Sequence, residues 1–315
     1  MSILNKLKEK SREYTEQVQC PVNKHTVFCY PLTAKDELAL KTLNKSIDLI
    51  YVHIGELIYR NVEFIDENDK RLSFSFSDFC KFISIYDLHI LMWGILKTTY
   101  NDKWGKFEND IVCPSCENKF PWINEVTYSE LLPPIGTSFE ELEEEFYKEF
   151  DKVDEEGQPI PFDLYFSSAT LTDIFKDYKI DINYKIPTLM DNINTLKCFT
   201  DNEVRESVIV STNTSGDLFM PFMKLISFID AIVIEDLTNP TSTSNKEILK
   251  NKSDIRAFIG GFLPLEKTNK LIELYNNEFD VYRPKFKKGF KCDKCLHEWD
   301  KEIPIEIEFF RKPFE

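Results

Sequence analysis

The chain has 315 residues, of which 42% are hydrophobic and 14% aromatic, with 26 phenylalanines and only nine glycines. This composition predicts a sizeable core divided between two subdomains, and it argues against glycine-rich phosphate-binding loops. The formal net charge of −15 argues against general binding to nucleic acid or to anionic membranes, since both require a basic surface.

The N-terminal residues predict a protein without a secretion signal, because positions 1–12 are charged throughout and contain no apolar segment. No stretch has the apolar length that a membrane-spanning helix needs. Eight cysteines, four of them in metal-type pairs, are typical of a reducing cytosol. For the other four, we favour ordinary buried thiols over half of a metal site formed by Cys20, His25 and Cys29.

The first part of the chain, residues 1–110, predicts a helical N-terminal domain. A β-prone run at 26–30 precedes Thr33 and Asp36, whose spacing is typical of a helix-capping pair. Apolar positions then recur at helical spacing over 40–61, which predicts one long amphipathic helix.

A hairpin is predicted over 62–76, where apolar and polar residues alternate in places. Two helices should follow, at 77–82 and 84–96, and the second is apolar around much of its circumference. His89 lies on that second helix. We expect it to be a buried, hydrogen-bonded histidine rather than a catalytic one, because no nucleophile or partner motif accompanies it.

Two Cys-x-x-Cys motifs with strand-like flanks predict a zinc ribbon, in which two hairpin tips meet at one metal ion. A two-residue spacer lets one tight turn supply two thiolates, and four thiolates leave no open coordination position, so the zinc should be structural. The module would comprise residues 111–126 plus 286–310. Its predicted ligands are Cys113, Cys116, Cys292 and Cys295.

Redox or disulfide use of these motifs is the weaker alternative, because a redox Cys-x-x-Cys opens a helix and neither motif precedes a helical pattern. The glycine that often follows such a knuckle is absent, with Glu117 and Leu296 in its place, which leaves the turn geometry less assured. His297 is interpreted as a supporting or surface residue rather than a ligand.

The most acidic segment predicts a helix over 137–158, with a capping box and a single apolar stripe. Such a charge run is usually a solvated helix face, but it is also suited to docking a basic partner. The residues predicted to bind that partner are Glu140, Glu143, Glu144 and Glu145.

Residues 159–285 predict an inserted domain that is first mixed β and then helical. Strands are expected at 162–166, 178–182 and 207–210, and a helix at 189–196. The strongly apolar run 218–237 predicts a buried helix. A loop should follow at 239–245, then a helix from Ser253 that Gly260 and Gly261 end, and another that Pro264 starts.

The segment 283–291 is basic with interleaved aromatic residues, a pattern used for single-stranded nucleic acid. We favour another interpretation, in which these lysines offset the charge of an anionic zinc tetrathiolate. The lysines concerned are Lys285, Lys287, Lys288 and Lys291.

No catalytic motif is present: the sequence lacks G-x-S-x-G, a phosphate-binding P-loop, a dinucleotide-binding glycine pattern and H-E-x-x-H. With only four histidines and a closed metal site, we expect the protein not to be an enzyme.

Four stretches, taken in their order along the chain, carry a family resemblance: 30–38, 84–92, 111–116, and 290–295 with 305–310. They resemble the T-even-like baseplate hub proteins, a family of zinc-knuckle tail proteins of contractile-tailed bacteriophages. The resemblance implies a structural subunit or assembly factor of the central hub of the tail baseplate, made in the host cytoplasm. The acidic helix and the β-rich segment 159–211 depart from the family pattern.

Together these features predict an α+β fold with a helical N-terminal part, a pair of zinc-ribbon-like hairpins closed by four cysteines, and a long inserted α/β segment. The expected function is that of a protein–protein scaffold in a phage baseplate, with other tail proteins as partners and no small-molecule substrate. A zinc-ribbon factor associated with nucleic acid or transcription is the alternative.

Overall fold

The computed structural model describes residues 15–42, 50–65, 71–100, 106–125, 131–132, 166–171, 175–199, 219–238, 245–283 and 285–304. Helices and strands are both abundant, which confirms the predicted α+β class. The chain forms two compact units. The first contains Met1–Ser46, Val52–Ile135 and Tyr282–Glu315, and the second contains Ile47–Tyr51 and Gly136–Val281.

The first unit contains a three-stranded antiparallel sheet. Its strands are β1 (Glu16–Gln19), β2 (Thr26–Cys29) and β3 (Val62–Ile65), in the order β1-β2-β3. Val27 and Cys29 alternate on the buried face of the central strand, as the two-residue period of a strand requires.

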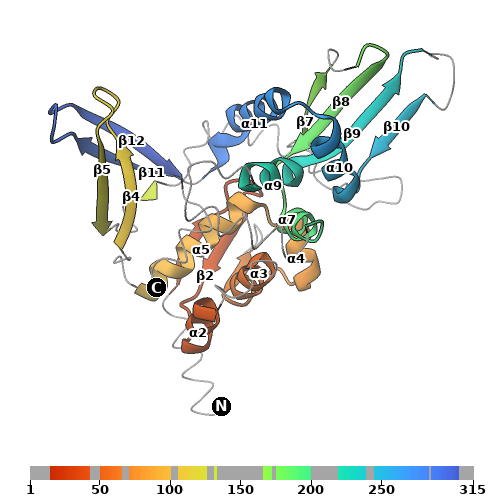
Figure 1. The fold of residues 1–315 in the computed structure, drawn as a ribbon. Helices are drawn as coiled ribbons and strands as arrows, with labels where there is room; N and C mark the ends of the chain where they lie inside the picture. The colour runs from red at the N-terminus through yellow and green to blue at the C-terminus, as the bar shows by residue number, and fades with distance from the viewer. Residues whose placement is uncertain are drawn as a thin grey trace. The chain divides into compact units, whose positions relative to one another are not determined.

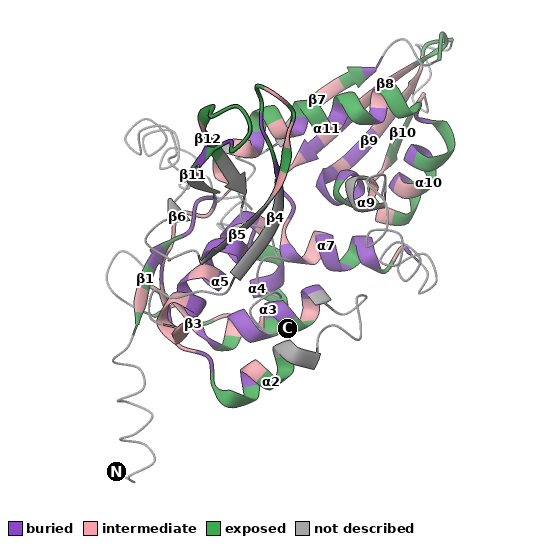
Figure 2. Ribbon diagram, turned by 60° about the vertical axis from the view of Figure 1, so that its left-hand side comes forward, coloured by how far each residue is buried: buried purple, intermediate pink, exposed green. Residues whose placement is uncertain are grey.

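Helix α5 (Ile85–Tyr100) packs on β1 and β2 and is buried along most of its length (Figure 2). Gly94 makes this close approach feasible. A Cβ atom at this position would lie 2.7 Å from Cys29 Sγ and 2.9 Å from Val18 Cγ1, closer than real Cβ contacts. The helix predicted over 84–96 is therefore confirmed as part of α5, with a glycine where it approaches the sheet closely.

Among the residues that the structure describes, the N-terminal part has three further helices: α2 (Ala34–Thr42), α3 (Ile50–Arg60) and α4 (Phe76–Phe82). The predicted capping pair forms at α2, where the Thr33 amide donates to Asp36 Oδ2 at 3.1 Å and the Asp36 amide donates to Thr33 Oγ1 at 3.3 Å. The helix predicted over 40–61 corresponds to the end of α2 and to α3. The residues between them, 43–49, lie outside the described part.

The predicted hairpin over 62–76 is wrong in its second half. β3 pairs with β2, and in the described residues 71–76 there is no strand but a single bridge, between Ile65 and Arg71. The chain then supplies aromatic side chains to a cluster instead of a strand. Its members lie 5.2–6.3 Å apart between ring centroids and are Tyr59, Phe64, Phe74, Phe76, Phe79 and Phe82.

The second unit is built on a four-stranded antiparallel sheet, ordered β10-β9-β8-β7 (Figure 1). The strands are β7 (Phe166–Leu171), β8 (Tyr178–Lys185), β9 (Ile229–Asp236) and β10 (Lys246–Leu249). Along β8 the side chains of Ile180, Ile182 and Tyr184 are buried, and the residues between them are partly exposed. One face of the sheet therefore carries the core of this unit.

Four helices in the described part of the second unit accompany the sheet: α7 (Leu189–Leu196), α9 (Phe219–Phe228), α10 (Lys252–Phe262) and α11 (Leu265–Phe279). α9 contacts the other three and β9. Phe228 stacks on Tyr275 with ring centroids 4.0 Å apart and an interplanar angle of 7°, which joins α9 to α11. The helix predicted over 189–196 is confirmed at both ends.

The helix predicted over 218–237 is wrong in its second half, because the chain passes directly from α9 into β9 at Ile229. An apolar run does not by itself distinguish a buried helix from a buried strand. Its β-branched second half here fills an inner strand, paired on one side with β8 and on the other with β10.

Lys252 fixes this helix-to-strand junction. Its Nζ donates hydrogen bonds to the carbonyl oxygens of Ile226, Ser227 and Ile229 at 3.1, 2.9 and 2.6 Å. The last carbonyls of a helix have no partner within the helix, so a buried ammonium group satisfies groups that would otherwise be left without donors.

The predicted glycine stop of α10 is also wrong. The helix includes Gly260 and Gly261 and ends at Phe262. The next residue, Leu263, has the extended backbone (φ −89°, ψ 120°) that a following proline favours. Pro264 then precedes α11, as predicted.

The acidic helix predicted over 137–158 and the strand at 207–210 lie outside the described residues, as do positions 162–165 of the first predicted strand. The strand at 178–182 is confirmed as part of β8. No helix in the described ranges combines the length and apolar character needed to cross a membrane.

Candidate metal centre

Two antiparallel hairpins carry the Cys-x-x-Cys motifs. The first consists of β4 (Lys106–Val112) and β5 (Lys119–Glu125), and the second of β11 (Lys285–Lys291) and β12 (Glu298–Pro304). A short strand, β6 (Leu131–Leu132), pairs with the start of β11. In each hairpin the first cysteine directly follows the first strand, so the motif forms the turn.

The four sulfur atoms lie together, all within 4.8 Å of one another. Across the two hairpins, Cys113 Sγ is 3.6 Å from Cys295 Sγ, and Cys116 Sγ is 3.6 Å from Cys292 Sγ. A tetrahedral zinc site with Zn–S bonds of about 2.3 Å has edges of about 3.8 Å, whereas a disulfide bond is about 2.05 Å long. The sulfur positions therefore fit a tetrahedral metal ion and not a pair of disulfides.

The turn geometry of the two motifs is the same. The amide of Cys113 donates to the Asn118 carbonyl and that of Glu117 to the Cys113 carbonyl, both at 2.9 Å. In the second motif the corresponding bonds, from Cys292 to His297 and from Leu296 to Cys292, are 2.9 and 2.8 Å long. One conformation thus holds both cysteine pairs.

Glu117 and Leu296, which replace the usual glycine, adopt the left-handed conformation with φ of 56° and 60°. This conformation costs a non-glycine residue about 1 kcal/mol. The turn geometry that the sequence left uncertain therefore forms without glycine, because the two backbone hydrogen bonds of each turn fix it.

The two turns shift the pKa of a thiol in opposite directions. The Asn118 amide lowers the pKa of Cys116, but desolvation and the neighbouring thiols outweigh it and raise that pKa to about 12, whereas the pKa of Cys292 is lowered. Backbone amides of Cys295 and Lys294 donate hydrogen bonds to Cys292 Sγ and lower the pKa of that thiol from 9.0 to about 7. Amide donors favour the thiolate, which is the form that binds zinc. Cys113 and Cys292 are buried, while Cys295 is exposed, so the cluster has one face open to solvent.

Aromatic side chains support the hairpins. Trp299 stacks against Phe290 with ring centroids 5.7 Å apart and against His297 at 5.8 Å, and Phe120 from the other hairpin meets its edge at 6.1 Å. The exposed His297 ring therefore packs on tryptophan, and His297 is not a member of the metal-binding cluster.

A third hairpin, formed by β1 and β2, repeats this turn without a second cysteine. Cys20 follows β1 as Cys113 follows β4, and β2 begins six residues later, as β5 does. The Cys20 amide donates to the His25 carbonyl at 3.0 Å, and the amide of Lys24 donates to the Cys20 carbonyl at 3.1 Å. Lys24 has a φ of 60°, matching Glu117.

Asn23 stands where the second cysteine of a knuckle would be. The His25 amide donates to Asn23 Oδ1 at 3.1 Å, just as the Asn118 amide donates to the sulfur of Cys116. Sequence analysis missed this knuckle because it searched for cysteine pairs. The signal was present in the run Cys20-Pro-Val-Asn23, which begins with Cys-Pro like Cys113-Pro-Ser-Cys116 and has asparagine at the second ligand position.

Asp87 on α5 receives the amides of this third turn. Val22 donates to its Oδ1 at 2.8 Å, and the Asn23 amide donates to the same carboxylate. These amides correspond in position to those of Lys294 and Cys295, which donate to the Cys292 sulfur. A buried carboxylate thus takes the place that a thiolate has in the metal-type knuckles.

The half-site that we disfavoured from the sequence is not assembled. Cys20 and Cys29 are both buried, and burial raises the pKa of each thiol. Within the described ranges, the four knuckle cysteines are the only group of three or more side chains placed to hold a metal.

The other residues singled out from the sequence are not part of the four-cysteine cluster. Lys291 pairs with Glu298 across the second hairpin at 2.6 Å, and both side chains are mostly exposed. His89 is buried on α5. The acidic residues proposed to bind a partner lie outside the described part: Glu140, Glu143, Glu144 and Glu145.

Comparisons with protein-family models, with curated proteins and with solved structures found no match to this chain.

Proposed function

We propose that Cys113, Cys116, Cys292 and Cys295 bind one structural zinc ion that joins the two hairpins. The cluster of four sulfur atoms within 4.8 Å carries this proposal. Zinc supplies a cross-link that two short hairpins cannot obtain from a hydrophobic core of their own, and thiolate sites of this kind contribute on the order of 10 kcal/mol. No catalytic role follows, because four thiolates complete the coordination shell.

Metal analysis together with the Cys292→Ser variant tests this proposal. The wild-type protein should contain one zinc per chain, and Cys292→Ser should lose it and unfold at a lower temperature. Cys198→Ser is the matched control, because Cys198 belongs to the second unit and is not one of the clustered cysteines, so this variant should keep both the zinc and the melting temperature. Wild-type protein without zinc, or a variant of unchanged stability, would contradict the proposal.

We further propose that the protein is a non-enzymatic structural or assembly component of a bacteriophage tail baseplate, at its central hub. The order of the resembling stretches supports this role, and a zinc-joined hairpin pair suits a rigid protein–protein scaffold. Its location would be the virion tail, and the host cytoplasm during assembly. Partners would be other tail proteins.

Co-purification from cells that express the tail genes tests the scaffold role. Tail proteins should co-purify with the wild-type chain. Charge reversal at Glu143, Glu144 and Glu145 should reduce the amount recovered, to an extent that depends on salt concentration. Recovery of no tail protein with the wild-type chain would refute it. Steeply salt-dependent binding of single-stranded nucleic acid at micromolar or lower concentration would instead favour the nucleic-acid alternative.

A further inference from the structure

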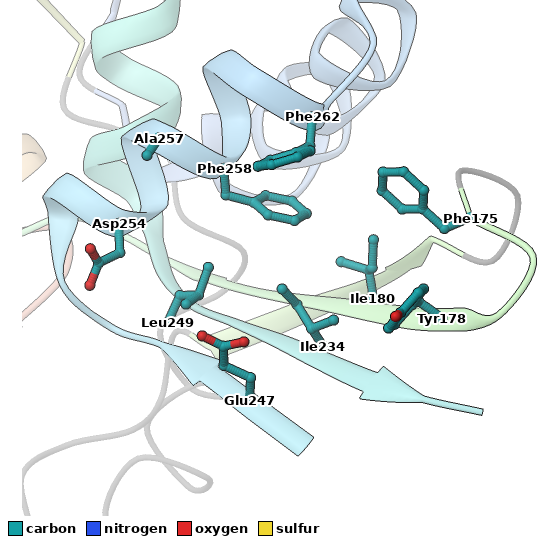
Figure 3. Close-up of a pocket in the computed structure, with 10 residues that line it drawn as sticks. All are labelled: Phe175, Tyr178, Ile180, Ile234, Glu247, Leu249, Asp254, Ala257, Phe258 and Phe262. Atoms are coloured by element: carbon teal, nitrogen blue, oxygen red, sulfur yellow. The ribbon is translucent and has the colours of Figure 1, made fainter. Parts of the chain in front are cut away.

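A groove in the second unit lies between α10 and the face of the sheet formed by β8, β9 and β10 (Figure 3). Its volume is about 550 Å³, within the range of protein ligand sites. Phe258 and Phe262 form one wall, from α10, and Tyr178 and Ile180 lie opposite them on β8. None of these residues belongs to the cysteine cluster, so the groove is a separate feature of the molecule.

The apolar part of the groove is exposed to an unusual degree. Phe262 is 60% exposed, Tyr178 is 42% exposed and Phe175 is 37% exposed. Together they place aromatic surface along one rim, where burial by a partner would be favourable at about 25 cal/mol per Å². A site for a small molecule encloses most of its ligand, whereas this rim stays open, which suits a segment of protein chain.

The other end of the groove is acidic. Glu247 on β10 and Asp254 on α10 both line it, on either side of Leu249. In the described structure neither carboxylate makes a hydrogen bond or an ion pair. The nearest lysine in sequence, Lys246, is instead 3.5 Å from Glu235 on the neighbouring strand.

The local structure explains why both carboxylates face the groove. Successive residues of a strand point to opposite faces, so Glu247 and Leu249 share the groove side of β10. Asp254 lies in the first turn of α10, where the helix dipole favours a negative charge, but the cap is made by Asn251, whose side chain accepts from the Ser253 amide at 2.9 Å. The Asp254 carboxylate thus stays available to a partner.

We propose that this groove binds an amphipathic segment of a partner protein, which inserts apolar side chains between α10 and the sheet and presents a lysine or arginine to Glu247 and Asp254. The pairing of an aromatic wall with two carboxylates fits such a segment better than an acidic or wholly apolar one. The net charge of −15 also favours a basic partner. This inference rests on the proposed scaffold role and specifies the chemistry of one partner.

Two synthetic helical peptides test the inference. Each carries leucines at positions i, i+3, i+4 and i+7; one has lysines on the flanking positions and the other has glutamates. With the full-length, zinc-loaded protein, fluorescence anisotropy should show that the lysine peptide binds at least about tenfold more tightly than the glutamate peptide. Phe262→Ala should weaken binding of the lysine peptide by about tenfold.

Charge reversal provides the decisive comparison. Glu247→Lys combined with Asp254→Lys should invert the preference, so that the glutamate peptide binds more tightly than the lysine peptide. Glu273→Lys, an exposed reversal on α11 outside the groove, should leave the preference unchanged. Equal binding of both peptides by the wild-type chain, or an uninverted preference in the double variant, would overturn the proposal.

Sedimentation velocity tests whether a second copy of this chain occupies the groove instead. A concentration-dependent dimer that Phe262→Ala abolishes would also overturn the proposal, because the groove would then be a self-association surface. Zinc content and recovery of tail proteins are measured on the same preparations. If the groove binds neither peptide while zinc content and recovery of tail proteins are normal, the groove proposal fails and the scaffold role does not.

Discussion

The Val22 amide donates a 2.8 Å hydrogen bond to Asp87 Oδ1, which joins the tip of the β1–β2 hairpin to the N-terminal turn of α5. In the hairpin of β11 and β12, the corresponding amide belongs to Lys294 and donates to the sulfur of Cys292. The same turn is therefore used in the chain with two kinds of anion. One is a carboxylate supplied by a helix, and the other is a thiolate placed for a metal.

Removing the Asp87 carboxylate should destabilise the first unit. Asp87→Ala leaves the amides of Val22 and Asn23 and the buried Ser84 hydroxyl without their acceptor, which should lower the free energy of unfolding by about 3 kcal/mol. Chemical denaturation measures the change.

Asp78→Ala is the matched control for this variant. Asp78 and Ser75 repeat the relation of Asp87 and Ser84, with a hydroxyl-to-carboxylate bond of 2.6 Å against 2.8 Å, but on an exposed helix end without knuckle amides. Asp78→Ala should lower the free energy of unfolding by no more than about 1 kcal/mol. Equal losses in the two variants would show that the knuckle amides contribute nothing.

The stability of the protein should depend on pH through Asp87. Burial raises the pKa of this carboxyl group from 3.8 to about 6, although hydrogen bonds from Val22 and Ser84 oppose the rise. Between these values the folded state binds more protons than the unfolded state, so the contribution of Asp87 is present below about pH 4 and is lost as the pH rises through 6.

The difference in unfolding free energy between wild type and Asp87→Asn isolates this effect, since asparagine does not titrate. Wild type should lose on the order of 3 kcal/mol relative to the variant between pH 4 and pH 7. Contributions from other groups, the metal ligands included, cancel in the comparison. A difference that stays constant with pH, or that grows in favour of wild type, would contradict the assignment.

Spacing alone was sufficient to predict the four clustered cysteines, because Cys-x-x-Cys fixes two sulfur atoms on one side of a turn. It was not sufficient for the knuckle at Cys20, where Asn23 replaces a ligand and the anion comes from Asp87, 64 positions after Asn23 in the sequence. Long-range partners of this kind leave no local pattern.

The junction between α9 and β9 shows the same limit. The apolar run up to Asp236 correctly predicts a buried segment. It does not predict whether that segment is a helix or a strand, because this depends on pairing with β8 and β10. Lys252 caps that junction from 23 residues beyond Ile229. Local signals were more reliable at α7, where Thr188 and Asp191 form a complete capping box within the element itself.

Metal removal should affect the two hairpins that carry the cysteine pairs and leave the β1–β2 hairpin unchanged. With a chelator present, hydrogen exchange should accelerate at the amides of Cys113, Glu117, Cys292 and Leu296, because the proposed zinc ion would hold their turns in place. The amides of Cys20 and Lys24 should keep their protection, since Asp87 closes that turn without a metal. Mass spectrometry of peptic fragments measures both, and added zinc should reverse the change. Simultaneous loss of protection in all three turns would contradict the expectation that the Cys20 turn does not depend on a metal.

Gly94→Ala should destabilise the packing of α5 on the sheet. The added Cβ atom would lie 2.7 Å from Cys29 Sγ and 2.9 Å from Val18 Cγ1, so the helix or the sheet must shift, at a cost of about 2 kcal/mol. Gly261→Ala is the control, because this glycine is also helical and no atom lies within 4 Å of its Cβ position. There the higher helix propensity of alanine should raise stability by up to about 1 kcal/mol. Thermal unfolding should thus move the two melting temperatures in opposite directions, and a shift of the same sign in both would refute close contact between α5 and the β1-β2 hairpin.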